Sequence, residues 1–414
     1  MSATDVRGTP GSPGSPSQRS LPGRPALRWQ SRAKSIPEIE RELALIWTSM
    51  SQGIETAGRA AEGELEGEVE RRVAARSSVM NLVVIAGRGE VGERVAAIVE
   101  GLTGRHPSRT IIVSTADPDG PSWINAQIEA HCVLPSPTSP ETCSELVYLT
   151  CGGESGHHIA ALVAPLLIHD LPVTVWWPGE PHFESKAAQE LLPMADRVIV
   201  DGSGWRGDGL AGLAAMAKLP ARFDLEVCDF ALLRQVRWRE AIASTFDRPN
   251  LLPFLGGLER IEVRYASRDG VPGMTNIVKP IYHVAWLASR LDMAVVAPLR
   301  VGTGAWSGYD AVLRHDRRRI PVSLRPIESG SPPGTTLAVE LYARRARSEL
   351  VLEVTAYADG VVVMASVDDE RLPERRFMAP RRREADLLAM TIDSAGHDHV
   401  AAEVLAMAER LVGQ

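Results

Sequence analysis

Short apolar runs alternate with helical segments between Asn81 and Asp201. Asn81-Leu-Val-Val-Ile-Ala86, residues 110–115 and residues 197–201 are rich in β-branched residues, which favours strands. Residues 93–102 and 185–192 have the spacing of helices. Alternation of this kind predicts a parallel or mixed sheet with flanking helices. We therefore expect an α/β fold for the N-terminal domain.

The pattern changes beyond about residue 293, where six strand-like runs follow one another and two helical segments, near 383–392 and 399–411, end the chain. Short turns such as Ala358-Asp-Gly360 indicate hairpins. This half is predicted to be an α+β domain with an antiparallel sheet. Because 414 residues exceed what one core usually serves, we expect an N-terminal domain over 36–292 and a C-terminal domain over 293–414.

The first 35 residues are rich in Pro, Gly, Ser and Arg. Such a composition cannot bury enough apolar surface to offset chain entropy, so residues 1–35 are predicted to be a disordered tail. Ser35-Ile-Pro-Glu38 then has the spacing of a helix start, and Ile39, Leu43, Ile46 and Trp47 form an apolar stripe. A helix is also expected from Val227, with apolar residues at four-residue spacing.

Composition excludes several classes of protein. A net charge of −7 argues against a nucleic-acid-binding protein, which needs a basic surface. The longest apolar region, residues 159–177, is interrupted by Pro165, His169, Asp170 and Pro172, so no membrane-spanning segment is expected. Four cysteines in so long a chain suggest a reducing compartment, and the cytoplasm is the expected location.

Cysteine and histidine placement gives little sign of metal or redox chemistry. Cys132, Cys143 and Cys151 could bring a thiol pair together on neighbouring strands, but buried free thiols are the favoured interpretation. His131, His157 and His158 lack the spacing of a metal site. We expect no bound metal and no cofactor.

Two adjacent tryptophans end a short apolar strand in Leu171-Pro-Val-Thr-Val-Trp-Trp-Pro-Gly179. Successive strand side chains point to opposite faces, so one of Trp176 and Trp177 is expected to face outward. Because no nucleophile or acid pair accompanies them, this stretch suits recognition better than catalysis. The candidate partner-binding residues here are Trp176, Trp177, Pro178 and Gly179.

A second candidate surface combines arginines with a tryptophan on one helix. Arg237, Trp238 and Arg239 are consecutive. Arg and Trp are enriched at interface hot spots because they join large contact area to directional hydrogen bonding. The alternative is an amphipathic helix with a solvated cationic face.

Gly87-Arg-Gly-Glu-Val-Gly92 is a G-x-G-x-x-G sequence between a predicted strand and a predicted helix. Gly87, Gly89 and Gly92, with Asp117 near the end of the next strand, have the arrangement of a dinucleotide fingerprint. Glu90 adds negative charge where a pyrophosphate would bind. We favour a tight strand-to-helix turn and keep an NAD(P)-dependent oxidoreductase as the alternative.

Several blocks together resemble the glucose-6-phosphate dehydrogenase assembly protein OpcA family. They occur in the family's order over nearly the whole chain beyond the tail. The blocks are Glu38-Ile-Glu-Arg-Glu-Leu with Trp47, Asn81-Leu-Val-Val, His106-Pro-Ser-Arg109, Cys143-Ser-Glu145, Gly152-Gly-Glu154, Pro165-Leu-Leu, Asp170-Leu-Pro-Val, Trp176-Trp177, Trp238-Arg-Glu240 and Ala285-Trp-Leu-Ala-Ser-Arg-Leu291.

The resemblance implies a non-enzymatic partner of glucose-6-phosphate dehydrogenase. Such a protein promotes the active oligomer of the dehydrogenase and activates it at the entrance of the oxidative pentose phosphate pathway. The candidate contact surface would then be the Trp177 loop together with the helix that carries Trp238 and Arg239.

Overall fold

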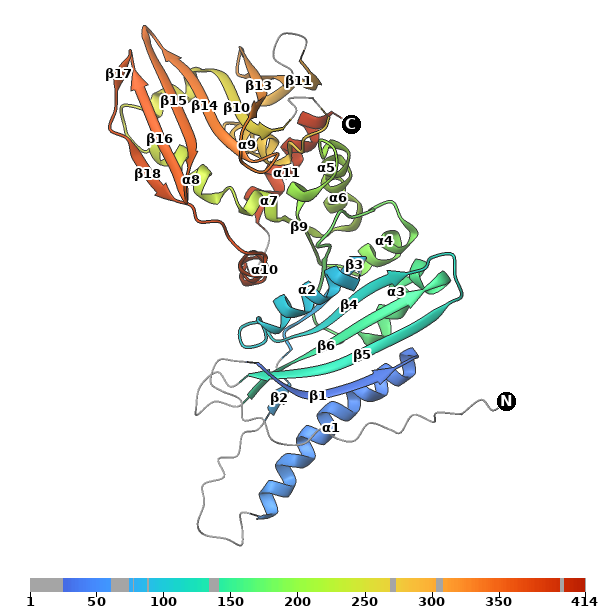
Figure 1. The fold of residues 1–414 in the computed structure, drawn as a ribbon. Coiled ribbons are helices and arrows are strands. Elements are labelled where there is room, and N and C mark those ends of the chain that lie inside the picture. Colours follow the sequence, from blue (N-terminus) through green and yellow to red (C-terminus); the bar gives the residue numbers. More distant parts are fainter. Residues whose placement is uncertain are drawn as a thin grey trace. The chain divides into compact units, whose positions relative to one another are not determined.

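The computed structural model describes residues 25–60, 74–76, 78–87, 89–133, 141–268, 273–302, 308–394 and 398–413. The chain divides into two compact units (Figure 1). Unit 1 contains residues up to Pro178 together with Glu184–Ala195, and unit 2 contains Gly179–Phe183 and everything from Asp196 onward. This division falls earlier than the expected boundary after residue 292.

Unit 1 is built on a mixed sheet with the strand order β1-β5-β6-β4-β3-β7. The four strands β6, β4, β3 and β7 run parallel, β5 and β1 extend the sheet antiparallel, and β2 pairs with β6. The predicted α/β fold is confirmed. The strands are β1 Ala26–Ala33, β2 Ala74–Arg76, β3 Met80–Gly87, β4 Ser108–Ala116, β5 Trp123–Val133, β6 Glu141–Gly152 and β7 Val173–Trp176.

Helices cover both faces of this sheet. Helix α1 (Ile36–Ala60) meets β6 through Trp47 and Glu145, whereas α2 (Gly89–Glu100) packs on β6 where Gly92 lies against Tyr148. Residues three apart on a strand point to opposite faces, so α1 and α2 lie on opposite sides of β6. The segment between β6 and β7 forms η1 Gly153–His157, α3 Ile159–Val163 and η2 Ala164–Leu166, with Pro165 near the start of η2. Helix α4 (Lys186–Leu191) and η3 (Leu192–Met194) complete unit 1.

The predicted tail extends too far. Ala26–Ala33 forms β1, which pairs antiparallel with β5, and the Ala33 side chain is buried. The rest of the predicted tail, up to residue 24, lies outside the described residues. Ala-Leu-Arg-Trp-Gln-Ser-Arg-Ala has weak alternation of its own, so its strand structure depends on the exposed edge that β5 offers.

The first part of unit 2 contains a parallel strand pair, β8 (Arg197–Val200) and β9 (Glu226–Asp229). The helix expected from Val227 is therefore wrong at its start, because Val227 lies in β9 and helix α7 begins at Phe230. A four-residue strand offers too few positions to reveal its period beside a strong helix pattern. The helices here are α5 Leu210–Ala217, α6 Leu219–Phe223, α7 Phe230–Leu233 and α8 Val236–Phe246, with η4 Gly202–Gly204 and η5 Leu252–Gly257.

A larger sheet forms the rest of unit 2, in the order β11-β12-β13-β10-β14-β15-β16-β17, with β18 beside β16. The expected antiparallel sheet is confirmed, except that β10 pairs in parallel with β13. The residues of β10 fall within the expected N-terminal domain of residues 36–292, but the strand joins the sheet of unit 2. Periodicity identifies a strand without showing which sheet it joins. The strands are β10 Leu258–Ser267, β11 Ala294–Val301, β12 Tyr309–His315, β13 Arg318–Glu328, β14 Thr336–Arg345, β15 Ser348–Tyr357, β16 Gly360–Val367, β17 Glu370–Arg371 and β18 Arg375–Met378.

Helix α9 (Val278–Arg290) forms the centre of the unit 2 core. It packs on β10, β13 and β14 and on the C-terminal helix α11 (His399–Val412), and ten of its residues are buried. Helix α8 packs on β15, β16 and β18, and α10 (Glu384–Asp393) follows β18 (Figure 1). Among the described residues, no helix is long and apolar enough to cross a membrane.

A disulfide joins Cys132 on β5 to Cys143 on β6, which are directly paired in the antiparallel ladder with Cα atoms 4.1 Å apart. The favoured interpretation of buried free thiols is therefore wrong for this pair, although Cys151 is free and buried. The spacing of the two cysteines did not reveal the pairing because it depends on the register between the strands.

Reducing this disulfide is expected to lower the free energy of unfolding by about 3 kcal/mol, because the bond closes a loop of about 11 residues in the unfolded chain. Guanidinium denaturation with and without dithiothreitol measures the difference. The Cys132→Ala/Cys143→Ala variant should respond to the reductant by less than about 0.5 kcal/mol. An equal response in both proteins would refute a contribution from this bond.

Candidate functional site

Both tryptophans of the Trp-Trp stretch are buried, with Trp176 at 0% and Trp177 at 6% exposure. The expectation that one of them faces outward is wrong. A parallel strand is covered on both faces, so opposite side-chain directions both lead into the interior. Pro178 is partly exposed and Gly179 is exposed, so these two residues offer the accessible surface of the stretch. Partner binding by this stretch stays a prediction.

Arg237, Trp238 and Arg239 follow one another on α8 and point in different directions, since each residue turns 100° about a helix axis. Arg237 is exposed and pairs with Glu240 at 2.6 Å. The Trp238 ring packs on the buried His283 ring with their centroids 5.2 Å apart. Arg239 is partly buried, which lowers the pKa of its guanidinium, and its Nη2 donates to the Leu232 carbonyl. Arg237 is therefore the member of this group best placed to contact a partner.

The two predicted clusters belong to different units: Trp176, Trp177 and Pro178 to unit 1, and Arg237 with its neighbours to unit 2. Gly179 begins the short segment of unit 2 that follows Pro178. Each cluster is therefore a separate candidate surface.

The glycine turn lies where the alternative cofactor site was predicted. Gly87 ends β3, which lies between the parallel strands β4 and β7, and α2 begins at Gly89. This is a topological switch point, the place where open α/β sheets bind ligands. The backbone of Gly87 has φ +69°, which favours glycine.

The other fingerprint residues have structural roles. A side chain at Gly92 would overlap the Tyr148 hydroxyl, so this glycine lets α2 approach the sheet. Asp117 is exposed, and its carbonyl accepts hydrogen bonds from the amides of Gly120 at 3.1 Å and Gly153 at 3.0 Å. These observations support the turn interpretation, whereas cofactor binding stays a prediction.

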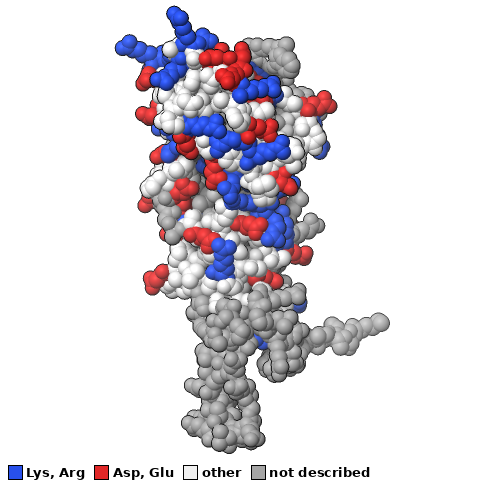
Figure 2. All heavy atoms as spheres, turned by 90° about the vertical axis from the view of Figure 1, so that its left-hand side faces the viewer, with Lys and Arg blue, Asp and Glu red and all other residues white. Residues whose placement is uncertain are grey.

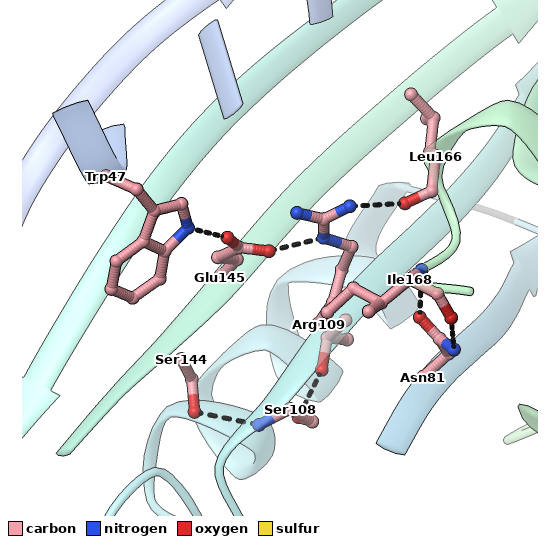
Figure 3. A network of polar contacts seen from close by, with 9 residues as sticks. Trp47, Asn81, Ser108, Arg109, Ser144, Glu145, Leu166 and Ile168 are labelled. Atoms are coloured by element: carbon pink, nitrogen blue, oxygen red, sulfur yellow. Dashed lines mark hydrogen bonds and ion pairs between the residues drawn. The ribbon is translucent and has the colours of Figure 1, made fainter. Parts of the chain in front are cut away.

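A buried ion pair holds α1 to the sheet of unit 1 (Figure 3). The Glu145 carboxylate, at 0% exposure, accepts hydrogen bonds from Trp47 Nε1 of α1 and from Arg109 Nε of β4. Arg109 Nη1 also donates to the Leu166 carbonyl at 2.8 Å. One carboxylate thus links a helix, two strands and the segment before β7.

Asn81 completes this arrangement on the neighbouring strand β3. Its Nδ2 donates to the carbonyls of Ile168 at 3.0 Å and Leu171 at 3.2 Å, and its Oδ1 accepts from the Ile168 amide at 2.8 Å (Figure 3). Trp47, Asn81, Arg109 and Glu145 all belong to blocks that carry the family resemblance. Their contacts show that these blocks maintain the fold of unit 1, a role that sequence reasoning missed. The sequence offered one sign of this role, since Arg109 and Glu145 are charged residues close to the apolar stretches of strands β4 and β6.

A second buried carboxylate lies in unit 2. Asp229, at the end of β9, accepts hydrogen bonds from Tyr282 Oη at 2.7 Å and from the amides of Gly202 at 2.9 Å and Ala231 at 2.7 Å. Burial, and next the negative charge of Asp201, raise the pKa of Asp229 to about 6. Sequence reasoning did not select this residue, because nothing near it in the sequence shows its burial.

The raised pKa of Asp229 makes stability depend on pH. The folded state disfavours the ionised carboxylate, so the contribution of this group is fully present below pH 4 and is lost as pH rises through about 6. In the wild type, the free energy of unfolding should fall by about 3 kcal/mol between pH 4 and pH 6 because of this group. We expect the Asp229→Asn variant to lack this fall. Urea denaturation of both proteins between pH 4 and 7.5 measures this. A wild-type minus variant difference that is constant across the range would contradict it.

Glu100, Glu129 and His131 form a group that could offer three metal ligands, since their ligand atoms lie within 4.8 Å of one another. His131 Nε2 already bonds to Glu129 at 2.7 Å, and Gln127 Nε2 donates to Glu129 at 2.6 Å. The hydrogen bond to His131 contributes most to a lowered pKa of Glu129. These contacts give Glu129 and His131 hydrogen-bond partners without an ion.

Two family models match consecutive parts of the chain. Residues 99–218 match the glucose-6-phosphate dehydrogenase subunit N-terminal domain, and residues 225–405 match the C-terminal domain of the same subunit. The chain belongs to the OpcA family. The family resemblance inferred from the sequence is confirmed, and the two OpcA family models together cover most of unit 2 and the second half of unit 1.

A relative from Synechocystis sp., named "Putative OxPP cycle protein OpcA", is 27% identical over 207 residues. The match covers 49% of this chain and 41% of that protein, so the chain spans about two fifths of the length of this OpcA family relative.

Solved structures also resemble the chain. An oxidoreductase from Sinorhizobium meliloti matches with 14% identity and a TM-score of 0.40, over 80% of this chain and 86% of its own. The transcriptional regulator Gal80p from Kluyveromyces lactis matches with 8% identity and a TM-score of 0.42, over 81% and 88%.

Proposed function

We propose that this protein is a non-enzymatic assembly factor and activator of glucose-6-phosphate dehydrogenase in the oxidative pentose phosphate pathway. The observation that carries the proposal is the match of both family models, which bear the name of this dehydrogenase, over residues 99–218 and 225–405. The protein acts in the cytoplasm, with the dehydrogenase as its partner. It binds neither nucleic acid nor membrane and uses no cofactor.

Three buried polar residues of unit 1 have structural roles. Glu145, Arg109 and Asn81 form hydrogen bonds that connect elements of unit 1 to one another. The Trp-Trp stretch and the α8 residues likewise combine buried anchors with a small number of exposed groups, as expected for a shaped contact surface.

An activator of this kind must bind the active oligomer of the dehydrogenase more tightly than the inactive form, because only a difference in affinity shifts the population. A tenfold rise in the active fraction corresponds to about 1.4 kcal/mol of differential binding free energy. Arg237, Pro178 and Gly179 are the accessible predicted residues that could supply such contacts.

Steady-state kinetics test the proposal. Glucose-6-phosphate-dependent NADP reduction by the dehydrogenase of the same organism is measured while this protein is added. We expect a rise in rate, or a fall in apparent KM, that saturates with the added protein. No change at a large molar excess would refute activation.

The alternative is an NAD(P)-dependent oxidoreductase, which the position of Gly87 at the switch point favours. Equilibrium dialysis of the purified chain against NADPH and NADH separates the two proposals. Binding that is lost in a Gly87→Val variant of normal stability would support the oxidoreductase. Without binding, the glycine turn is structural.

A further inference from the structure

Unit 2 contains a cavity of about 710 Å³ that shares only Arg237 with the proposed partner-binding residues. Its walls come from the carboxyl end of β8, the end of α7, the start of α8, the start of α9, the loop before β14, the turn between β15 and β16 and the entry to α10. The strands β8 and β9 are parallel, so their carboxyl ends meet at one edge of the pair. In α/β folds, ligands bind at that edge.

The side chains around this cavity are mainly cationic. Two carboxylates, Asp201 and Glu384, face six cationic residues, namely Arg234, Arg237, Lys279, Arg381, Arg382 and Arg383. Figure 2 shows Lys and Arg mixed with Asp and Glu over most of the face in view, with a group of Lys and Arg at its upper left edge. In the lining of the cavity, cationic side chains outnumber carboxylates.

Part of this positive charge is already neutralised. Arg234 pairs with Asp201 at 2.8 Å, Arg237 with Glu240 at 2.6 Å and Arg383 with Asp386 at 3.1 Å. In the described part of the chain, no carboxylate lies within ion-pair distance of Lys279 or Arg381. These two residues can form ion pairs with an anionic ligand.

Of these two residues, Lys279 gives the stronger indication of an anionic ligand because it is partly buried. Burial lowers the pKa of its amine, Arg234 and Arg381 lower it further, and the attraction of Asp201 opposes them. An ammonium group that has lost part of its hydration is stabilised by an opposite charge nearby. An anion in the cavity would supply that charge.

One helix N-terminus adds to the same effect. Lys279 is the second residue of the 13-residue helix α9, whereas the N-terminus of α10 is already capped by the Asp386 carboxylate, which accepts from the Arg383 amide. The N-terminal turn of a helix carries partial positive charge and amide donors, which favour anions.

We propose that this cavity binds a small phosphorylated molecule with at least two anionic groups, held by Lys279 and Arg381. The volume lies within the range of small-molecule sites, about 300 to 1,000 Å³, and exceeds what a single phosphate fills. Arginine guanidinium groups match phosphate geometry, and lysine supplies a point charge. This site stands independently of the dehydrogenase.

Isothermal titration calorimetry with pyrophosphate on the full chain tests the proposal. We expect one site per chain, with affinity at least tenfold weaker in Lys279→Met and in Arg381→Ala. Arg381 is exposed in a loop, so its replacement should leave the fold intact. The Arg381→Ala variant therefore still tests the proposal if Lys279→Met fails to fold. Arg317→Ala removes the same charge from an exposed hairpin turn outside the cavity and is the matched control.

Weak binding of pyrophosphate that all three variants share would overturn the proposal, as would no binding to the wild type. A hexaglutamate peptide gives the decisive comparison. If that peptide binds with the same dependence on Arg381 and pyrophosphate does not, the cavity is a docking site for an acidic protein segment, which also overturns it.

Discussion

Glu145→Leu is expected to lower the free energy of unfolding by about 3 to 5 kcal/mol, the largest loss among the variants considered. Glu145 is fully buried and accepts hydrogen bonds from Trp47 and from Arg109, itself at 7% exposure. Without the carboxylate, the Arg109 charge remains in the interior, where its Nη1 donates to the Leu166 carbonyl. Guanidinium denaturation followed by far-UV circular dichroism measures the loss.

Two further variants sharpen this prediction. Arg109→Met/Glu145→Leu removes both charges and should recover more than half of the loss, because no unpaired charge stays buried. Glu349→Gln breaks an exposed pair with Arg344 and should cost less than about 1 kcal/mol. If Glu145→Leu costs no more than Glu349→Gln, the network of Figure 3 does not hold unit 1 together.

Arg237→Glu is expected to raise the concentration needed for half-maximal activation of the dehydrogenase by about 30-fold, which corresponds to the loss of a 2 kcal/mol hot spot. Arg237 is exposed, so reversal of its charge should leave the fold intact. The reversal would also place the new carboxylate beside that of Glu240, where the two negative charges repel each other. Activity titrations with increasing concentrations of each variant measure the shift.

Arg317→Glu is the matched control, because Arg317 is exposed in unit 2 outside the predicted surface. Arg237 also lines the cationic cavity, and Lys279→Met separates the two roles because it leaves the α8 surface unchanged. Equal shifts for Arg237→Glu and Arg317→Glu would show that only the net charge matters and would remove Arg237 from the contact surface.

The sequence was sufficient to predict the elements that carry a strong period. The strand expected at Asn81 is present as a continuous apolar run that is buried on both faces. The helix that begins after Ser35 and its Trp47 stripe are present because burial of one face imposes a helical period on the residues. The antiparallel half was predictable because β14 and β15 largely alternate between buried and less buried residues and tight turns join β14, β15 and β16.

Features that depend on partners distant in the sequence could not be predicted. Trp177 is buried because the surroundings of β7 enclose both faces, and Ala26–Ala33 is a strand because β5 has a free edge. The Cys132–Cys143 bond depends on strand register. Of the candidate surface, the sequence suggested Arg237, which stays a prediction, and could not show that Trp238 packs on His283.

The mass of the dehydrogenase in solution, with and without this protein, tests the central claim most directly. Size-exclusion chromatography with light scattering is carried out near the concentration at which the dehydrogenase begins to dissociate. We expect this protein to elute with the dehydrogenase and to convert it to a larger, active oligomer. Separate elution, with an unchanged mass of the dehydrogenase, would contradict the assembly function.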